Sequence, residues 1–158
     1  MKKVLLILAC GIATQLSYAQ ATPKWADKAK KAVFSIVTYD KDNKIKNTGN
    51  GFYINENGTA LSDYTLFEGA ERAVIINADS KELPVLRILG ANSMYDIVKF
   101  NTEADKKTIA LKSASQPASV GETVYLLPYS TQKAATCQTG TVTKVDTIGD
   151  KAYYYTLA

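Results

Sequence analysis

Short apolar runs, each closed by turn residues, are the feature of this chain that most constrains its fold. β-Branched or apolar residues at every second position are typical of strands that bury one face. Such runs follow one another from residue 32 to residue 100, with short polar intervals between them. They are residues 32–39, 51–55, 59–62, 73–77, 83–89 and 97–100. This spacing predicts an all-β fold in which the strands close into one antiparallel barrel.

Turn residues place the connections between these predicted strands. Asp40 to Asn43 closes the first run with side chains that suit a turn. Asn57-Gly58 joins the second run to the third, because both residues accept positive φ. Ahead of the first strand, helix formers from Trp25 to Lys31 predict one short N-terminal helix.

The chain after the barrel predicts a second β unit. Residues 20–101 form the expected N-terminal barrel, and residues 102–122 are more polar and are expected to be a connector. Residues 123–158 are expected to form a partial second barrel. Its strand candidates are residues 123–127, 136–146 and 151–157.

The first residues are typical of a secretory signal peptide. Lys2 and Lys3 precede an apolar run, and small residues end at Ala19, where a signal peptidase would cleave. We therefore expect a periplasmic or extracellular protein. Cys10 offers a less favoured alternative, a lipoprotein, because the apolar run before it is shorter than the ~7 to 15 residues of such a region. No later stretch is a transmembrane candidate.

Charge and residue composition exclude several function classes. The formal net charge is +4, with Lys and acidic residues interspersed, so we expect no nucleic-acid partner. There is no histidine, and Cys137 is the only cysteine after cleavage, so we expect no disulfide, metal or cofactor. Cys137 itself is interpreted as a small apolar side chain rather than a nucleophile.

Several segments carry a common resemblance. Gly49-Asn50-Gly51-Phe52 resembles a Gly-Ser-Gly-Phe strand, and the segment from Gly58 to Leu66 matches one that ends in Thr-x-x-His-Val. Ser93 to Val98 resembles a segment carrying a catalytic aspartate, and Ser119 to Tyr125 and Thr139 to Thr143 resemble two strands of a second barrel. Together, these segments resemble those of the trypsin-like serine endopeptidases of the Deg/HtrA type.

This resemblance implies the two-barrel chymotrypsin fold, with the first barrel complete and the second partial. It puts Thr65 at the position of the histidine base and makes Asp96 the remnant triad aspartate. It stops before the Gly-Asn-Ser-Gly-Gly segment that holds the nucleophile and the oxyanion hole, and no such segment occurs in this chain. We therefore expect a catalytically degenerate, C-terminally truncated member.

The chemistry of acyl transfer needs a base that this chain lacks. A serine nucleophile, a histidine and an orienting aspartate act together, and a threonine hydroxyl such as that of Thr65 does not cycle a proton near neutral pH. We expect no peptidase activity, and either a pseudoprotease or a fragment of one. Asp96 has an alternative interpretation as an acceptor for backbone amides.

Two other functions stay open. The first is an exported β-barrel module that binds peptides or an exported partner protein. The second is an unrelated small all-β secreted domain.

Overall fold

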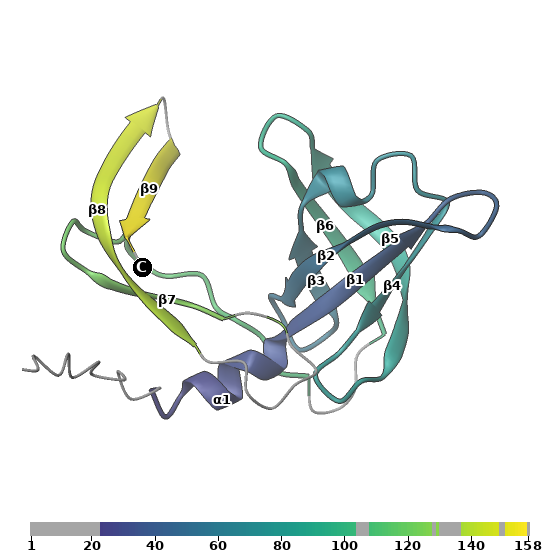
Figure 1. Cartoon of the computed structure of the whole chain (residues 1–158), viewed down its shortest axis with the longest axis horizontal. Coiled ribbons are helices and arrows are strands. Elements are labelled where there is room, and N and C mark those ends of the chain that lie inside the picture. Colours follow the sequence, from purple (N-terminus) through teal and green to yellow (C-terminus); the bar gives the residue numbers. More distant parts are fainter. Residues whose placement is uncertain (1–22, 104–107, 128, 130–136, 149–150, 158) are drawn as a thin grey trace, which may run out of the picture.

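Antiparallel strands close into a six-stranded barrel between Val33 and Thr102 (Figure 1). The structure is a computed structural model that describes residues 23–103, 108–127, 129, 137–148 and 151–157. The strands lie in the order β1-β2-β3-β6-β5-β4, so each has two neighbours. They are β1 Val33–Tyr39, β2 Ile45–Tyr53, β3 Thr59–Ser62, β4 Arg72–Ile76, β5 Glu82–Asn92 and β6 Ile97–Thr102. The predicted all-β barrel fold is confirmed.

A second, three-stranded sheet follows the barrel in the chain. It consists of β7 (Thr123–Leu126), β8 (Gln138–Ile148) and β9 (Lys151–Leu157), with β8 in the middle. The short helix α1 (Ala26–Ala29) lies between the barrel and this sheet (Figure 1). It is anchored to the sheet by Trp25, whose ring meets that of Tyr125 edge to face at 5.0 Å.

The observed strand limits differ from the predicted ones where the chain is polar. β2 begins at Ile45 rather than at residue 51, because it pairs with β1 from Ile45 to Phe52 although its first half is largely exposed. β6 runs on to Thr102, whose hydroxyl donates to the carbonyl of Pro84 at 2.8 Å. The observed α-helix is shorter than the predicted one, and Lys30–Ala32 continues it as a 3₁₀ turn, η1.

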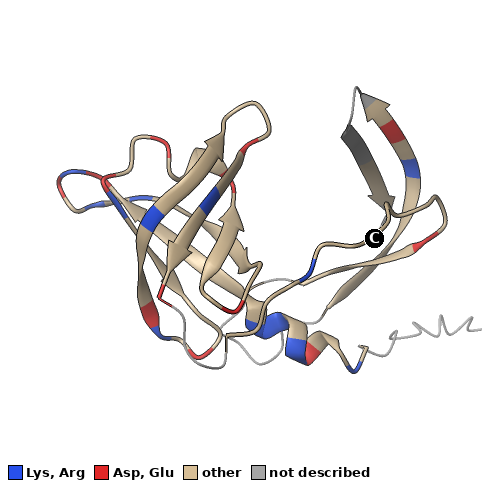
Figure 2. Ribbon diagram, turned by 180° about the vertical axis from the view of Figure 1, so that it is seen from behind, with Lys and Arg blue, Asp and Glu red and all other residues tan. Residues whose placement is uncertain are grey.

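The predicted signal peptide, residues 1–19 with Cys10 and Ala19, lies outside the described residues. Within the part of the chain that is described, no helix has the length and the apolar character needed to cross a bilayer. Acidic and basic residues are interspersed over the barrel and the sheet (Figure 2).

Three hairpin turns of the barrel share one construction. In each, a side-chain oxygen of Asp40, Asn55 or Asn77 accepts the backbone N–H groups two and four residues later, at 2.9 to 3.0 Å. The residue three positions on has positive φ: Asn43 (61°), Gly58 (80°) and Ser80 (60°). Asn57-Gly58 lies in the turn that joins β2 to β3, as predicted, but of these two residues Gly58 alone has positive φ. The turn is instead closed by the Asn55 side chain.

The barrel core takes at least one side chain from every strand. Its buried residues are Phe34, Ile36, Tyr53, Ala60, Ile75, Leu83, Val98 and Phe100. The Phe34 ring lies 4.8 Å from that of Tyr53 and 6.2 Å from that of Phe100. The Phe34 ring also lies against Gly51, where a Cβ atom would be 2.6 Å from Phe34 Cε2 and 2.8 Å from the Leu61 carbonyl oxygen. The barrel therefore closes around Phe34 only because position 51 has no side chain.

This contact predicts different costs for two alanine substitutions. Gly51→Ala should lower the free energy of unfolding by about 2 kcal/mol, because the new methyl group displaces Phe34 or the backbone of β3. Gly90→Ala should change it by no more than about 0.5 kcal/mol, since nothing lies within 4 Å of a Cβ there. Urea unfolding of both variants is the measurement. If both variants lose the same amount of unfolding free energy, this explanation of barrel closure is wrong.

A second prediction concerns local stability. Every barrel strand is paired on both sides, whereas β7 and β9 each pair with β8 alone among the described strands. Strands that are paired on one side open more readily. Amide hydrogens of the β7-β8-β9 sheet should therefore exchange faster than those of the barrel. Uniform protection in a hydrogen-exchange experiment would show that the sheet is as stable as the barrel.

Candidate functional site

Thr65 is held at one end of the barrel by a short 3₁₀ turn that follows β3, η2 (Tyr64–Leu66). The Asn47 side-chain amide in β2 donates to the carbonyl oxygens of Thr65 (3.4 Å) and Leu66 (3.2 Å). Gly49 in the same strand leaves room for the Leu66 side chain, which would overlap a Cβ at position 49. The first half of β2 therefore positions Thr65. Asn47 is not among the predicted site residues, because the predicted strand begins at residue 51.

Asp96 reaches Thr65 from the turn between β5 and β6. It has φ 50°, a conformation that aspartate adopts more readily than most residues. Its carboxylate accepts the Thr65 backbone N–H at 2.7 Å, and the Thr65 Oγ1 lies 3.0 Å from Oδ1 and 2.9 Å from Oδ2. The resemblance puts Thr65 and Asp96 at two positions of one triad and so predicts that their side chains lie close together, which these distances confirm. Their assignment to the base and triad positions stays a prediction.

Thr65 and Asp96 are joined by hydrogen bonds that Thr65 donates. The Thr65 hydroxyl carries one proton and donates it to the Asp96 carboxylate, which also accepts the Thr65 amide. The hydrogen bonds between Thr65 and Asp96 therefore link η2 to the β5–β6 turn. Asp96 also fits the alternative interpretation, since one of its donors is a backbone amide.

Cys137 precedes β8 in the second sheet and is half-buried and not disulfide-bonded. Its Sγ atom lies 3.8 Å from the carbonyl oxygen of Gln138. The chain has no histidine that could activate this thiol. The described contacts therefore give its thiol no activating partner.

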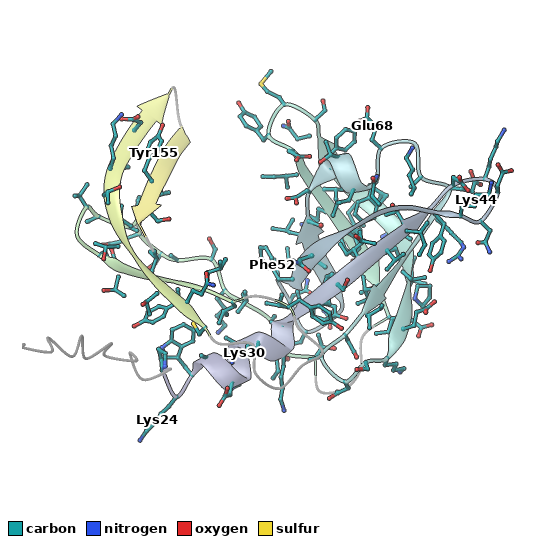
Figure 3. All side chains as sticks on the ribbon, viewed as in Figure 1. Lys24, Lys30, Lys44, Phe52, Glu68 and Tyr155 are labelled. Atoms are coloured by element: carbon teal, nitrogen blue, oxygen red, sulfur yellow. The ribbon has the colours of Figure 1, made fainter. Side chains whose placement is uncertain are left out.

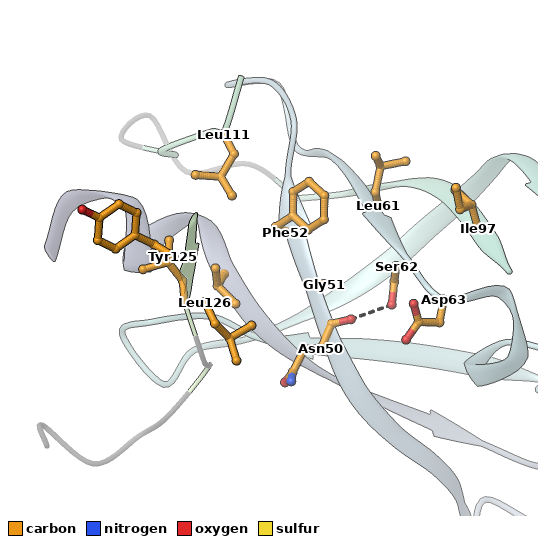
Figure 4. Close-up of a pocket in the computed structure, with 12 residues that line it drawn as sticks. Asn50, Gly51, Phe52, Leu61, Ser62, Asp63, Ile97, Leu111, Tyr125 and Leu126 are labelled. Atoms are coloured by element: carbon orange, nitrogen blue, oxygen red, sulfur yellow. Dashed lines mark hydrogen bonds between the residues drawn. The ribbon is translucent and has the colours of Figure 1, made fainter. Parts of the chain in front are cut away.

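An apolar groove of about 670 Å³ lies between the barrel and β7 (Figure 4). Phe52, Leu61 and Ile97 contribute from the barrel, and Tyr125, Leu126 and Leu127 contribute from β7 and the residue after it. Phe52 projects on the side of the barrel that faces the second sheet (Figure 3). The groove has no sequence signal, because its lining residues come from several strands and no strand supplies more than three of them.

The polar part of the groove is small. The Ser62 hydroxyl is buried and donates to the carbonyl oxygen of Asn50 at 2.7 Å. Next to it, Asp63 is exposed, and it is the only charged residue among the described residues that line the groove. Asp63 is the N-cap of η2, yet its side chain makes no capping hydrogen bond. The groove therefore presents one carboxylate beside an apolar surface.

The Thr65–Asp96 pair predicts the effect of two substitutions at position 96. Asp96→Ala should lower the free energy of unfolding by about 1.5 kcal/mol, because it removes the acceptor of the Thr65 donors and is less suited to positive φ. Asp96→Asn keeps one acceptor oxygen and should cost less than about 1 kcal/mol. Urea unfolding measures both, with the exposed turn residue Asp79→Ala as the control. If Asp96→Ala leaves the free energy of unfolding unchanged, this would contradict a structural role for the pair.

Comparison with known proteins supports the fold. No protein-family model and no curated protein sequence matches this chain. Among solved structures, it is similar to the serine endoprotease from Yersinia pestis, with a TM-score of 0.62 and 17% sequence identity. The match covers 75% of this chain and 43% of that chain, so this chain spans less than half of the length of the endoprotease. At this identity the similarity shows the fold alone, which is the trypsin-like fold of serine endoproteases.

Proposed function

We propose that this chain is an exported protein of trypsin-like fold that does not hydrolyse peptide bonds, a pseudoprotease. The observation that carries the proposal is Thr65, which stands where the resemblance puts the general base and donates its hydroxyl proton to Asp96. A histidine there would accept a proton from a nucleophile and return it to the leaving group. Thr65 does neither, because its hydroxyl has no basic form near neutral pH.

Export is part of the same proposal. It is supported by the basic and apolar pattern that ends at Ala19 in the sequence. An extracellular or periplasmic setting is also compatible with a fold that has no disulfide among its described residues, because the barrel is closed by its core and its strand pairing.

A second candidate function is the binding of peptides or of an exported partner protein. The observation that favours it is the groove between the barrel and β7. Its volume of about 670 Å³ is within the range of ligand sites, about 300 to 1,000 Å³. Exposed apolar residues gathered at one place mark interaction surfaces more often than scattered ones.

Absence of hydrolysis is the expected result of an activity assay. The 158-residue chain and its Thr65→His variant should both release no peptides from fluorescent casein above a buffer control. A restored imidazole still lacks a matching Gly-Asn-Ser-Gly-Gly segment in this sequence. Circular dichroism of the variant checks that it is folded, and an active trypsin-like protease checks the assay. Turnover or a burst with either protein would overturn the proposal.

A further inference from the structure

We propose that Asn57 is a site of spontaneous deamidation, at which the barrel acquires an isoaspartate that weakens the β2–β3 turn. Asparagine is among the thermolabile residues. The chain holds two Asn-Gly pairs, Asn50-Gly51 and Asn57-Gly58. A glycine after asparagine favours the reaction, because no Cβ hinders the approach of the glycine nitrogen to the asparagine side chain. The two pairs share this chemistry, so their surroundings decide which of them reacts.

The reaction needs water and no other reactant. The backbone nitrogen of Gly58 attacks Cγ of Asn57, a bond forms between these two atoms, and the bond from Cγ to Nδ2 breaks. Nδ2 leaves as ammonia with the proton that the Gly58 nitrogen loses, and a succinimide ring remains. Water then opens this ring. Addition of water to the backbone carbonyl carbon of residue 57 gives isoaspartate, and addition to Cγ gives aspartate.

The first Asn-Gly pair is held in the middle of β2. Gly51 is paired with Phe34 of β1 on one side and with Ser62 of β3 on the other. The carbonyl oxygen of Asn50 accepts the Ser62 hydroxyl at 2.7 Å. Ring formation requires the backbone of this pair to rotate, and these contacts oppose the rotation until the neighbouring strands separate. Opening of paired strands in a core is a rare event.

The second Asn-Gly pair lies in the turn between β2 and β3. Asn57 is exposed, and Gly58 has φ 80°. The Oδ1 atom of Asn55 accepts the amides of Asn57 and Thr59, each at 3.0 Å. The Gly58 amide, which is the nucleophile, lies between these two donors in the chain. Rotation at this position requires the turn to open and leaves the barrel strands paired, and turns open more readily than strands.

The isoaspartate product changes the path of the backbone. It inserts one extra atom into the main chain between positions 57 and 58. The Asn55 side chain bonds amides on both sides of this point, and the Gly58 carbonyl oxygen accepts the Thr102 amide of β6 at 3.0 Å. The extra atom therefore displaces these hydrogen bonds and loosens the start of β3 at Thr59. An aspartate at position 57 keeps the ordinary backbone path.

Peptide mapping by mass spectrometry tests the site. The 158-residue chain is incubated in warm, mildly alkaline buffer, and fragmentation of its peptides assigns each product to a position. Deamidation at Asn57 should be at least roughly tenfold faster than at Asn50, because only Asn50 requires strand separation. In concentrated urea, the matched control, the two rates should agree within roughly threefold. Equal rates in the folded chain, or no product at Asn57 while the urea control reacts, would overturn the proposal.

Two variants test the effect on the barrel. Asn57→Gln keeps a side-chain amide but disfavours the five-membered ring, and Asn57→Asp supplies the aspartate product without the extra main-chain atom. Hydrogen exchange of the incubated natural chain should reveal a second population in which β3 amides exchange faster. Incubated Asn57→Gln and fresh Asn57→Asp should each show one population. If Asn57→Gln also develops the fast population, or if fresh Asn57→Asp already has it, isoaspartate at position 57 is not its cause and the proposed weakening is wrong.

Discussion

The approach of the Phe34 ring to the bare backbone of Gly51 is the contact on which the rest of the structure depends. It lets β2 lie over the core aromatic rings while pairing with β1 and β3. The same strand supplies Asn47, which holds η2, and Asn50, which accepts the Ser62 hydroxyl. The packing of the core and the geometry of the candidate site are therefore fixed by one strand.

The fold could be predicted largely because its signals are local. Apolar alternation marks the barrel strands, and each of three turns has an Asp or Asn followed three residues later by a residue that accepts positive φ. The start of β2 had no such signal. Its first residues, from Ile45, are mostly exposed on both faces and are strand only because β1 pairs with them. Tertiary pairing outweighed local pattern there.

The candidate site was harder to predict from the sequence than the fold. Thr65 and Asp96 are 31 residues apart, so neither periodicity nor spacing brings them together, and only the resemblance suggested that they meet. Asn47 carried no signal, since a polar residue in a polar stretch is typical of a loop. The groove could not be predicted for another reason: Phe52, Ile97 and Leu126 come from three strands that are far apart in the sequence, and exposed apolar residues are ordinary on a protein surface.

Asp96 and Asp63 differ in their hydrogen bonding. Asp96 accepts hydrogen bonds from Thr65, whereas the Asp63 side chain makes no capping hydrogen bond. A half-buried carboxylate such as that of Asp96 needs donors, and Thr65 supplies two from one residue, so this end of the barrel keeps its order without an imidazole. The chemistry of a site can change in this way while the fold is retained. Because Asp96 is committed to Thr65, the exposed carboxylate of Asp63 is left as the charge beside the apolar groove.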